Sequence, residues 1–415
     1  MTMQFALKKT TSPVAYCALS VKTGTRYEDP KYNGLAHLIE HMLFKGTEKR
    51  NSNSINNVLE KEGGELNAYT TKEDIVLYST VLCEDLPKAI DLLAELALTS
   101  VFPAKELEKE LDVIYDEIIS YKDSPSESIY DHFEMLLFKG HPLEKPILGE
   151  KKTLRKVNSS ILKEFLTAYF TPENIVFTVV GNIEAAALQK LIQKSLAKYR
   201  PQQSFEIKQI IEQEKPSLAD NNKPDSSLSI GEKFSVELTK RNHQAHCIIG
   251  CSAYSYYSGW KRVALALLTN ILGGPASGSR LNMTLREKHA LVYNIDASYT
   301  PYSDTGIFSI YFGCDKSLLG KCRELVYKEL DKIVTSQLTE RELKNAKKQF
   351  LGQLFISQDN AEAQCLAMGK SLNVYNRIDP FAKTRKQIEN ITSEQLQEVA
   401  KEILSKERLS ELIYK

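Results

Sequence analysis

Residues 34–46 read GLAHLIEHMLFKG and bring His37, Glu40 and His41 together in the order His-x-x-Glu-His. Apolar residues recur through this stretch at helical spacing and a glycine stands at each end, which predicts a short helix. Side chains four positions apart lie on one face of a helix, so the two imidazoles can aim at one point. Two histidines, a carboxylate base and an open position are the parts of a catalytic zinc site, which we therefore expect here.

The composition is that of a globular protein. The 415 residues are enough for two or more domains, and 42% of them are hydrophobic and 26% charged. A formal net charge of +1 argues against a dedicated nucleic-acid binder, and no apolar run approaches the length of a membrane span. We therefore expect neither nucleic acid nor a membrane as a partner.

The amino-terminal segment and the cysteines indicate the compartment. The segment MTMQFALKKTTSPVAYCALSVKTG has lysines after its first apolar residues and no long apolar core, so it predicts a first strand and not a signal peptide. The seven cysteines are scattered and odd in number, which fits a reducing compartment better than a disulfide framework. We expect a cytoplasmic protein.

Strand and helix patterns alternate along the first half of the chain. Besides the motif helix, strands are predicted at residues 15–21, 65–70, 75–82 and 174–180, and helices at 53–62, 86–99, 104–121, 127–138, 160–170 and 183–199. The turn at residues 71–74 is predicted to join two of the strands as a hairpin. Residues from 201 to about 232 are rich in polar residues and proline, which predicts a linker.

The same pattern then begins again. Strands are predicted at residues 245–254, 293–299, 306–312 and 409–414, and helices at 263–272, 280–288, 317–335, 340–354 and 393–404. We interpret this as an internal duplication. The predicted fold is α+β, with two tandem homologous α/β-sandwich domains, each a mixed, mostly antiparallel sheet packed with helices. The predicted divisions are a catalytic domain at 1–204, a linker at 205–232 and a second domain at 233–415.

The second copy lacks the metal residues. Alignment of the two repeats puts Ala266, Thr269 and Asn270 in place of the three motif residues. Gln353 likewise falls where Glu117 stands in the first copy. Because only one of the two copies carries the residues for metal chemistry, we expect the other copy to bind or position a molecule.

A catalytic zinc site needs a third protein ligand, and the predicted helix at 104–121 is crowded with carboxylates. At about 100° per residue, Glu110 and Glu117 fall together on one flank of its apolar face. Carboxylates at such positions are partly buried and need a partner, which is either a metal or a Lys or Arg side chain. The spacing alone does not choose between these alternatives.

Further motifs extend the pattern beyond the first helix. They are HLIEH at residues 37–41, FKGT at 44–47, GGELNAYTTKED at 63–74 and ELEKELDVIYDEI at 106–118. With these motifs the chain resembles the inverzincin zinc metallopeptidases, the group of pitrilysin, insulysin and mitochondrial processing peptidase. The resemblance covers essentially the whole chain, including the duplication, and is to the short two-domain, processing-peptidase-like members.

The resemblance implies roles for five residues. His37, His41 and Glu117 match the ligands of one Zn²⁺ per chain, and Glu40 matches the general base. Glu110 matches a catalytic-site carboxylate that supports the ligands from behind. The implied activity is that of a zinc-dependent metalloendopeptidase that hydrolyses peptides or unfolded polypeptide segments in an enclosed clamshell chamber.

The resemblance also implies how a peptide substrate is held. Asn67 and Ala68 match substrate-facing positions of a strand near the metal helix, where an extended peptide can pair with the strand edge. Arg286 and Tyr293 are similar to the Arg and Tyr with which family members hold substrate from the second copy. Some family members divide the zinc motif and the Arg/Tyr pair between different subunits. Because this chain carries both, the resemblance favours a homodimer, with a heterodimer with a paralogue as the alternative.

Two alternatives remain to be weighed. The chain can be a catalytically silent or partner-dependent subunit of a peptidase or scaffold complex, but its intact motif residues argue against this. A second metal cluster is suggested by His243, His246, Cys247 and Cys251. We expect no metal there, because a strand would point His246 and Cys247 to opposite faces.

Overall fold

The computed structural model of the chain describes residues 2–202, 205–213 and 226–415 and divides into two compact units. The first unit contains Met1–Ile119, Lys145–Gln213 and Ile356–Ile378, and the second contains Ser120–Glu144, Glu214–Phe355 and Asp379–Lys415. Each unit therefore draws on both halves of the chain. Of the predicted linker, residues 214–225 lie outside the described residues.

The first unit is built on a six-stranded sheet in the order β3–β4–β2–β5–β1–β6. Its strands are β1 (Thr2–Lys9), β2 (Val14–Val21), β3 (Glu65–Thr70), β4 (Ile75–Leu82), β5 (Ile175–Gly181) and β6 (Glu206–Gln209). The β3–β4, β4–β2 and β2–β5 pairs are antiparallel, whereas β1 lies parallel to both β5 and β6. The predicted hairpin of β3 and β4 is confirmed at its predicted bounds.

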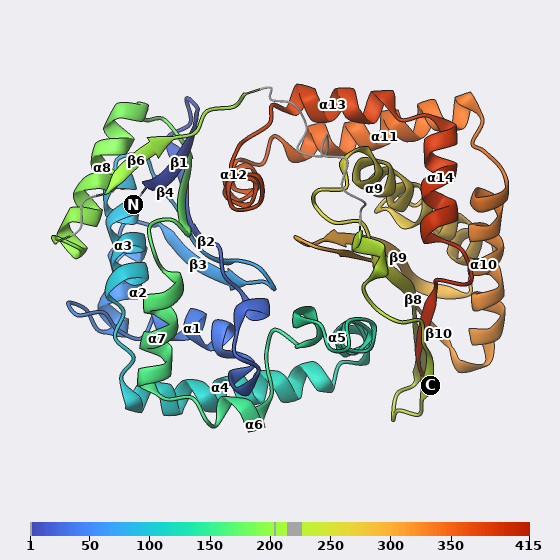
Figure 1. Cartoon of the computed structure of the whole chain (residues 1–415), viewed down its shortest axis with the longest axis horizontal. Helices are drawn as coiled ribbons and strands as arrows, with labels where there is room; N and C mark the ends of the chain where they lie inside the picture. The colour runs from blue at the N-terminus through green and yellow to red at the C-terminus, as the bar shows by residue number, and fades with distance from the viewer. Residues whose placement is uncertain (1, 203–204, 214–225) are drawn as a thin grey trace. The chain divides into compact units, whose positions relative to one another are not determined.

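Helices pack against both faces of this sheet (Figure 1). The helices of the first unit are α1 (Leu35–Leu43), α2 (Ser52–Glu60), α3 (Leu86–Thr99), most of α4 (Ala104–Lys122), α6 (Lys151–Leu154), α7 (Ser159–Tyr169), α8 (Ala185–Tyr199) and α12 (Ala361–Tyr375). On one face α3 packs against β2, β4 and α8, and on the other α12 packs against β2 and β5. Burial on both faces explains the apolar run of β5.

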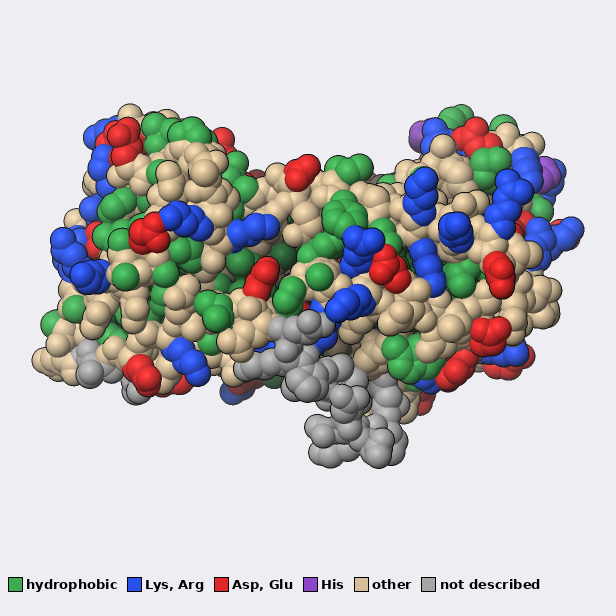
Figure 2. All heavy atoms as spheres, turned by 90° about the horizontal axis from the view of Figure 1, so that it is seen from above, with side chains coloured by type: hydrophobic (Ala, Val, Ile, Leu, Met, Phe, Trp, Pro, Cys, Tyr) green, Lys and Arg blue, Asp and Glu red, His purple; other side chains and the backbone are tan. Residues whose placement is uncertain are grey.

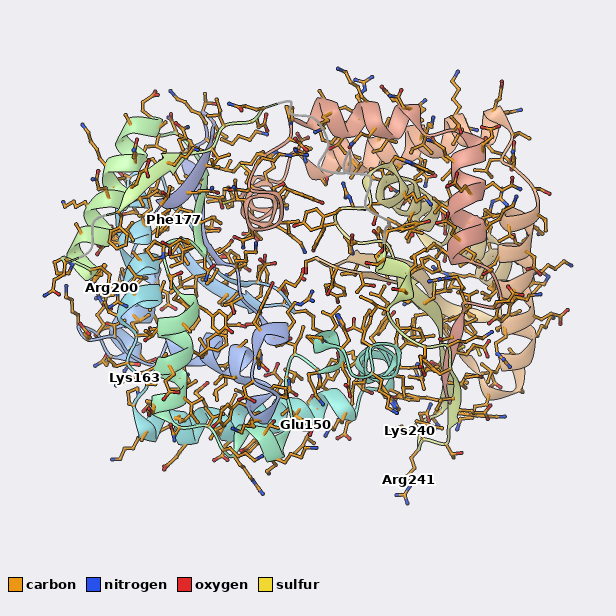
Figure 3. All side chains as sticks on the ribbon, in the orientation of Figure 1. Glu150, Lys163, Phe177, Arg200, Lys240 and Arg241 are labelled. Atoms are coloured by element: carbon orange, nitrogen blue, oxygen red, sulfur yellow. The ribbon has the colours of Figure 1, made fainter. Side chains whose placement is uncertain are left out.

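The side chains follow this layering. Phe177 of β5 is fully buried and points into the core of the first unit, whereas Lys163 of α7 points to solvent (Figure 3). On the face shown in Figure 2, basic and acidic side chains are interspersed, in keeping with the formal net charge of +1. Within the described residues, no helix has both the length and the apolar character needed to cross a membrane.

The second unit repeats the first sheet with one strand fewer, in the order β7–β11–β8–β10–β9. Its strands are β7 (Ser235–Leu238), β8 (Gln244–Ala253), β9 (Val292–Pro301), β10 (Gly306–Asp315) and β11 (Ser410–Tyr414). The β7–β11 pair is parallel, like the β1–β5 pair of the first sheet, and the other pairs are antiparallel; β6 has no counterpart. The same order and strand sense confirm the predicted duplication and the α+β fold class.

The helices of the second unit complete the repeat. They are α5 (Pro125–Leu137), α9 (Gly259–Gly273), the π-helical segment η6 (Asn282–Lys288), α10 (Leu319–Thr335), most of α11 (Glu340–Ser357), α13 (Phe381–Asn390) and α14 (Ser393–Ile403). Helix α9 packs against β9, just as α1 packs against β3. Helix α5, although it comes from the first half of the sequence, packs against β8 and β11.

Several elements were not predicted. Strand β1 was not separated from β2, and β6, β7, α12 and α13 were missed. Helix α12 has small and polar residues on both sides, and its buried positions include Cys365, Gly369 and Asn373, so its sequence shows no clear apolar stripe. Tertiary packing against the sheet, and not helical periodicity, therefore selects this helix.

Gly369 lies where α12 approaches the first sheet most closely. A Cβ atom at this position would lie 2.6 Å from the Oγ of the buried Ser20 and 3.6 Å from the Oγ1 of Thr178. Gly352 of α11 offers a contrast, because nothing lies within 4 Å of its corresponding position. The two glycines share a helical setting and differ in the space beside them.

We predict that Gly369→Leu destabilises the protein by about 1–3 kcal/mol, because the added side chain forces α12 away from the sheet. Gly352→Leu serves as the matched control and should be neutral or stabilising by up to about 1 kcal/mol, since leucine favours the helix. Thermal unfolding of the two variants measures the difference. Equal melting temperatures for the two variants would contradict the packing described for α12.

Candidate metal centre

The metal helix α1 begins at an unusual place in the backbone. Its N-cap, Gly34, has φ of 96°, and a Cβ atom there would lie 2.9 Å from the Cα of Gly149. Only glycine fits such a left-handed and crowded position without strain. The carboxylate of Glu28 supplies the missing cap, since it accepts hydrogen bonds from the backbone N–H groups of Gly34 (2.9 Å) and Ala36 (2.7 Å).

The two histidines of α1 and Glu117 of α4 converge. The rings of His37 and His41 have centroids 4.7 Å apart. The Oε2 atom of Glu117 lies 3.9 Å from Nε2 of His37 and 3.8 Å from Nε2 of His41. Within the described part of the chain, these three side chains are the one group of His, Cys, Asp or Glu donors close enough to hold a metal ion.

This donor set fits a zinc ion. Ligand atoms placed tetrahedrally at about 2.0–2.1 Å from zinc are roughly 3.4 Å apart, so the observed separations need only a few tenths of an ångström of closure. Burial, and secondarily the charge of His41, lower the pKa of His37 to about 4, so this imidazole is neutral at pH 7 and can bind a metal. The Glu117 side chain is 45% exposed, which leaves one side of the group open to solvent.

Glu110 contacts His41 at Nδ1, the ring nitrogen that faces away from Glu117. Its Oε2 atom lies 3.2 Å from Nδ1 of His41, and its Oε1 atom lies 2.6 Å from Nζ of Lys45. An Nδ1–H donated to Glu110 fixes the tautomer of His41 with the Nε2 lone pair directed toward Glu117. The geometry thus distinguishes the two carboxylates, which their spacing in the sequence could not. Glu117 lies near the Nε2 atoms of both histidines, whereas Glu110 contacts Nδ1 of His41.

His37 has no comparable support. Its Nδ1 atom is buried, and no residue of the described ranges hydrogen-bonds to it. The two imidazoles are therefore held differently, His41 by a carboxylate and His37 by the packing of the helix that carries it. The position of α1 itself accordingly decides where His37 points.

Glu40 is held by the neighbouring strand. The Oγ1 of Thr70, the last residue of β3, donates a 2.6 Å hydrogen bond to its Oε2. Burial raises the pKa of Glu40 above its ordinary value, while the Thr70 hydrogen bond and His41 act in the opposite direction. A carboxylate with a raised pKa beside a metal group is suited to accept and return a proton.

The strand that carries Asn67 and Ala68 has an open edge. Strand β3 is the outermost strand of its sheet, with Asn67 exposed and Ala68 half-buried. Thr71 and Asp74 form a hydrogen-bonded pair at the turn, and such pairs alternate along an antiparallel ladder. By that alternation, the backbone groups of Leu66, Ala68 and Thr70 point to the open edge.

The other predicted substrate residues belong to the second unit. Arg286 lies in η6 and Tyr293 in β9, and both side chains are exposed, Tyr293 by 83%. Their role in binding substrate stays a prediction. In the same unit, the Nδ1 of His246 lies 2.8 Å from the hydroxyl of Tyr311, and Cys247 is buried on the opposite face, as the strand pattern predicted.

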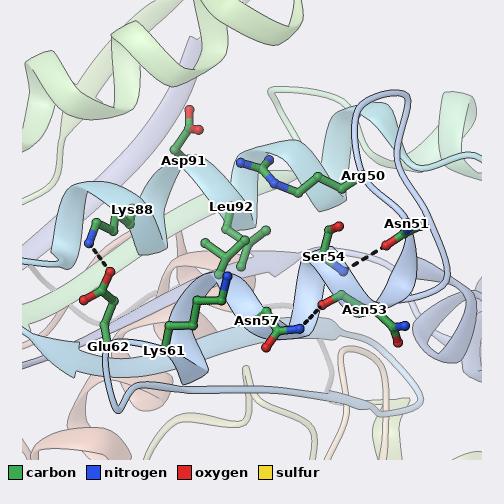
Figure 4. A pocket seen from close by; sticks show the side chains of 11 residues that line it. Arg50, Asn51, Asn53, Ser54, Asn57, Lys61, Glu62, Lys88, Asp91 and Leu92 are labelled. Carbon is green, nitrogen blue, oxygen red and sulfur yellow. Dashed lines mark hydrogen bonds and ion pairs between the residues drawn. The ribbon is translucent and has the colours of Figure 1, made fainter.

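A hollow of about 520 Å³ lies elsewhere on the first unit, beside α2 and α3 (Figure 4). Several of its charged groups pair with other charged or polar groups. Lys88 pairs with Glu62, and Asp91 accepts hydrogen bonds from Lys198 and Tyr199. None of the metal-site residues lines it, so we assign it no part in the chemistry.

Two family models match the chain. One, described as "Insulinase (Peptidase family M16)", matches residues 4–151, and the other, described as "Peptidase M16 inactive domain", matches residues 156–350. All the metal-site residues fall in the first match. The word "inactive" thus describes the half in which the sequence shows no metal residues.

Relatives and solved structures agree with this assignment. The chain is 31% identical to a protein of Rickettsia bellii and 29% identical to one of Bacillus subtilis, over 95% of this chain and 91% of each relative, and both are named uncharacterized zinc proteases. A protease structure from Helicobacter pylori shares the fold, with a TM-score of 0.86 and 20% identity over 99% of this chain and 96% of that chain. By its family matches and its bacterial relatives, the chain belongs to the M16 (insulinase) family of peptidases.

Proposed function

We propose that the protein is a zinc-dependent endopeptidase that hydrolyses peptides or unfolded polypeptide segments. The observation that carries this proposal is the convergence of His37, His41 and Glu117 on one point beside Glu40. The names of the bacterial relatives, uncharacterized zinc proteases, support the metal and the reaction class.

The residues of this chain divide the chemistry among them. His37, His41 and Glu117 would hold the zinc ion, which supplies Lewis acidity and lowers the pKa of a water molecule to about 7. Glu40, fixed by Thr70, accepts a proton as water attacks the peptide carbonyl and delivers it to the departing amine nitrogen. Glu110 keeps His41 in the tautomer that directs Nε2 to the ion.

The open edge of β3 is the proposed substrate strand. An extended peptide that pairs with Leu66, Ala68 and Thr70 would run beside Glu40, because Thr70 bonds to that carboxylate. Strand addition recognises backbone groups, so it favours extended segments over folded proteins. We further propose that Asn67 contacts the substrate, that Arg286 and Tyr293 of the metal-free repeat help to hold it, and that the chain acts as a homodimer.

We predict that His37→Ala and Glu117→Ala each lose bound zinc, because two remaining ligands hold the ion weakly. Metal content of the purified proteins, measured by atomic emission after dialysis, checks this. Glu108→Ala on the same helix is the matched control, since Glu108 is exposed and outside the group. Full zinc content in either ligand variant would contradict the assigned site.

We predict that Glu40→Gln keeps zinc and lowers kcat by about 10²–10⁴-fold, because the amide cannot accept a proton from water. A quenched peptide, cleaved with and without chelator, measures the rate beside zinc content. Thr70→Val, which removes only the hydrogen bond to Glu40, should lose less. An active Glu40→Gln enzyme would remove Glu40 from the mechanism.

We predict that Glu110→Gln weakens zinc binding by about 10–100-fold without abolishing it, because it supports a ligand and is not one itself. Competition with a chelator of known affinity measures this loss. Activity should return at saturating zinc, unlike that of Glu117→Ala. Equal and complete zinc loss in both variants would show that Glu110 binds the ion directly.

A further inference from the structure

Glu28 accepts hydrogen bonds from three donors at the amino-terminal end of helix α1. Besides the N–H groups of Gly34 and Ala36, its carboxylate accepts a 3.2 Å hydrogen bond from Nδ2 of Asn33. Both carboxylate oxygens are used, one by Ala36 and the other by Gly34 and Asn33. Neither the predicted metal site nor the proposed mechanism gives this residue a role.

The segment that carries Glu28 is also tied to the end of the proposed substrate strand. The backbone N–H groups of Thr25 and Arg26 donate to the carbonyl oxygens of Thr71 and Lys72, at 3.2 and 3.0 Å. These carbonyls belong to the turn that follows β3. The segment before α1 therefore holds the metal helix at one end and the hairpin at the other.

A third segment closes the arrangement around Asn33. The Nδ2 of Asn33 also donates to the carbonyl oxygen of Pro146 at 3.2 Å, and the Oγ1 of Thr153 donates to the carbonyl oxygen of Asn33 at 2.7 Å. Gly149 packs so closely here that a Cβ atom would lie 2.4 Å from that same oxygen. Asn33 and Gly149, which lie beside the Glu28 hydrogen bonds, thus have little freedom to shift.

We propose that Glu28 is a positioning residue that fixes the first turn of α1, and through it His37, against strand β3. The inference rests on the proposed function, because it concerns the same site. Helix α1 has nine residues, and His37 follows directly on Ala36, whose N–H Glu28 holds. Since no side chain in the described residues bonds to Nδ1 of His37, the backbone alone aims this ligand.

Loss of the Glu28 hydrogen bonds would affect the first turn of α1. A first turn whose N–H groups lose their acceptor frays, and this turn contains one of the two imidazoles. A misplacement of about 1 Å in a catalytic group can cost about 100-fold in rate. An ordinary capping residue would contribute to stability alone, so metal geometry is the property that distinguishes the two roles.

The experiment compares Glu28→Gln with wild type and with Asp29→Asn. Glutamine has one acceptor oxygen, so at least one of the backbone bonds is lost whatever the protonation of Glu28. Asp29 is the matched control because it is an exposed neighbouring acid that caps a separate short helix through the N–H of Lys31. Zinc affinity by chelator competition, the visible spectrum of the Co²⁺-loaded protein, and kcat and KM are measured well below each melting temperature.

We expect Glu28→Gln to bind zinc about 10-fold more weakly, to change the Co²⁺ spectrum and to lower kcat by about 10–100-fold with KM within about 2-fold. A lower melting temperature with unchanged zinc affinity and spectrum would overturn the inference and leave a purely structural cap. If Glu28→Gln does not fold, Glu28→Asp, which keeps a shorter carboxylate, takes its place with the same criteria.

The outcome is separable from that of the proposed function. A wild-type protein that binds zinc but cleaves no peptide would contradict the proposed function, while zinc affinity and the Co²⁺ spectrum would still decide the role of Glu28. A wild-type protein that cleaves peptide and a Glu28→Gln variant with an unchanged Co²⁺ spectrum would contradict this inference alone.

Discussion

The site depends on a helix that presents two imidazoles one turn apart to a carboxylate from another helix. That convergence needs α1 to be held from both sides. Its apolar face is buried in the hydrophobic core of the first unit, and its amino-terminal N–H groups donate hydrogen bonds to Glu28. Thr70 and Glu110 then fix Glu40 and His41 from a strand and from α4. One short helix therefore connects the sheet, the proposed metal ligands and the proposed base.

The two copies of the duplicated unit differ at the positions of the metal motif. Both sheets have the same strand order and sense, and α9 occupies the place of α1. In α9, the Oγ1 of Thr269 donates a hydrogen bond to the carbonyl oxygen of Leu265 in the same helix. Asn270 is buried beside Gly274, which follows the last residue of the helix. The second copy thus has the same scaffold, with Ala266, Thr269 and Asn270 at the positions of His37, Glu40 and His41.

The sequence predicted local features well and tertiary ones less well. His37, His41 and Glu40 could be predicted because their relation is a helical spacing, and β3–β4 because its turn and alternation are local. Glu117 and Glu110 required the resemblance, since their difference depends on how α4 meets α1. Helix α12 was missed because Gly369 and Cys365 suit a packed sheet and show no helical stripe. Glu28 has no signal in spacing, because its bonds span a loop.

The contribution of α12 to the first unit has a consequence for synthesis of the protein. Ala18, Val76 and Val180 on one face of the first sheet are buried together with Cys365 of that helix. A nascent chain has made the metal helix and the whole sheet long before it reaches residue 361. This apolar face therefore stays uncovered on the ribosome until the chain is nearly finished, which delays completion of the first unit until most of the second half of the chain has been translated.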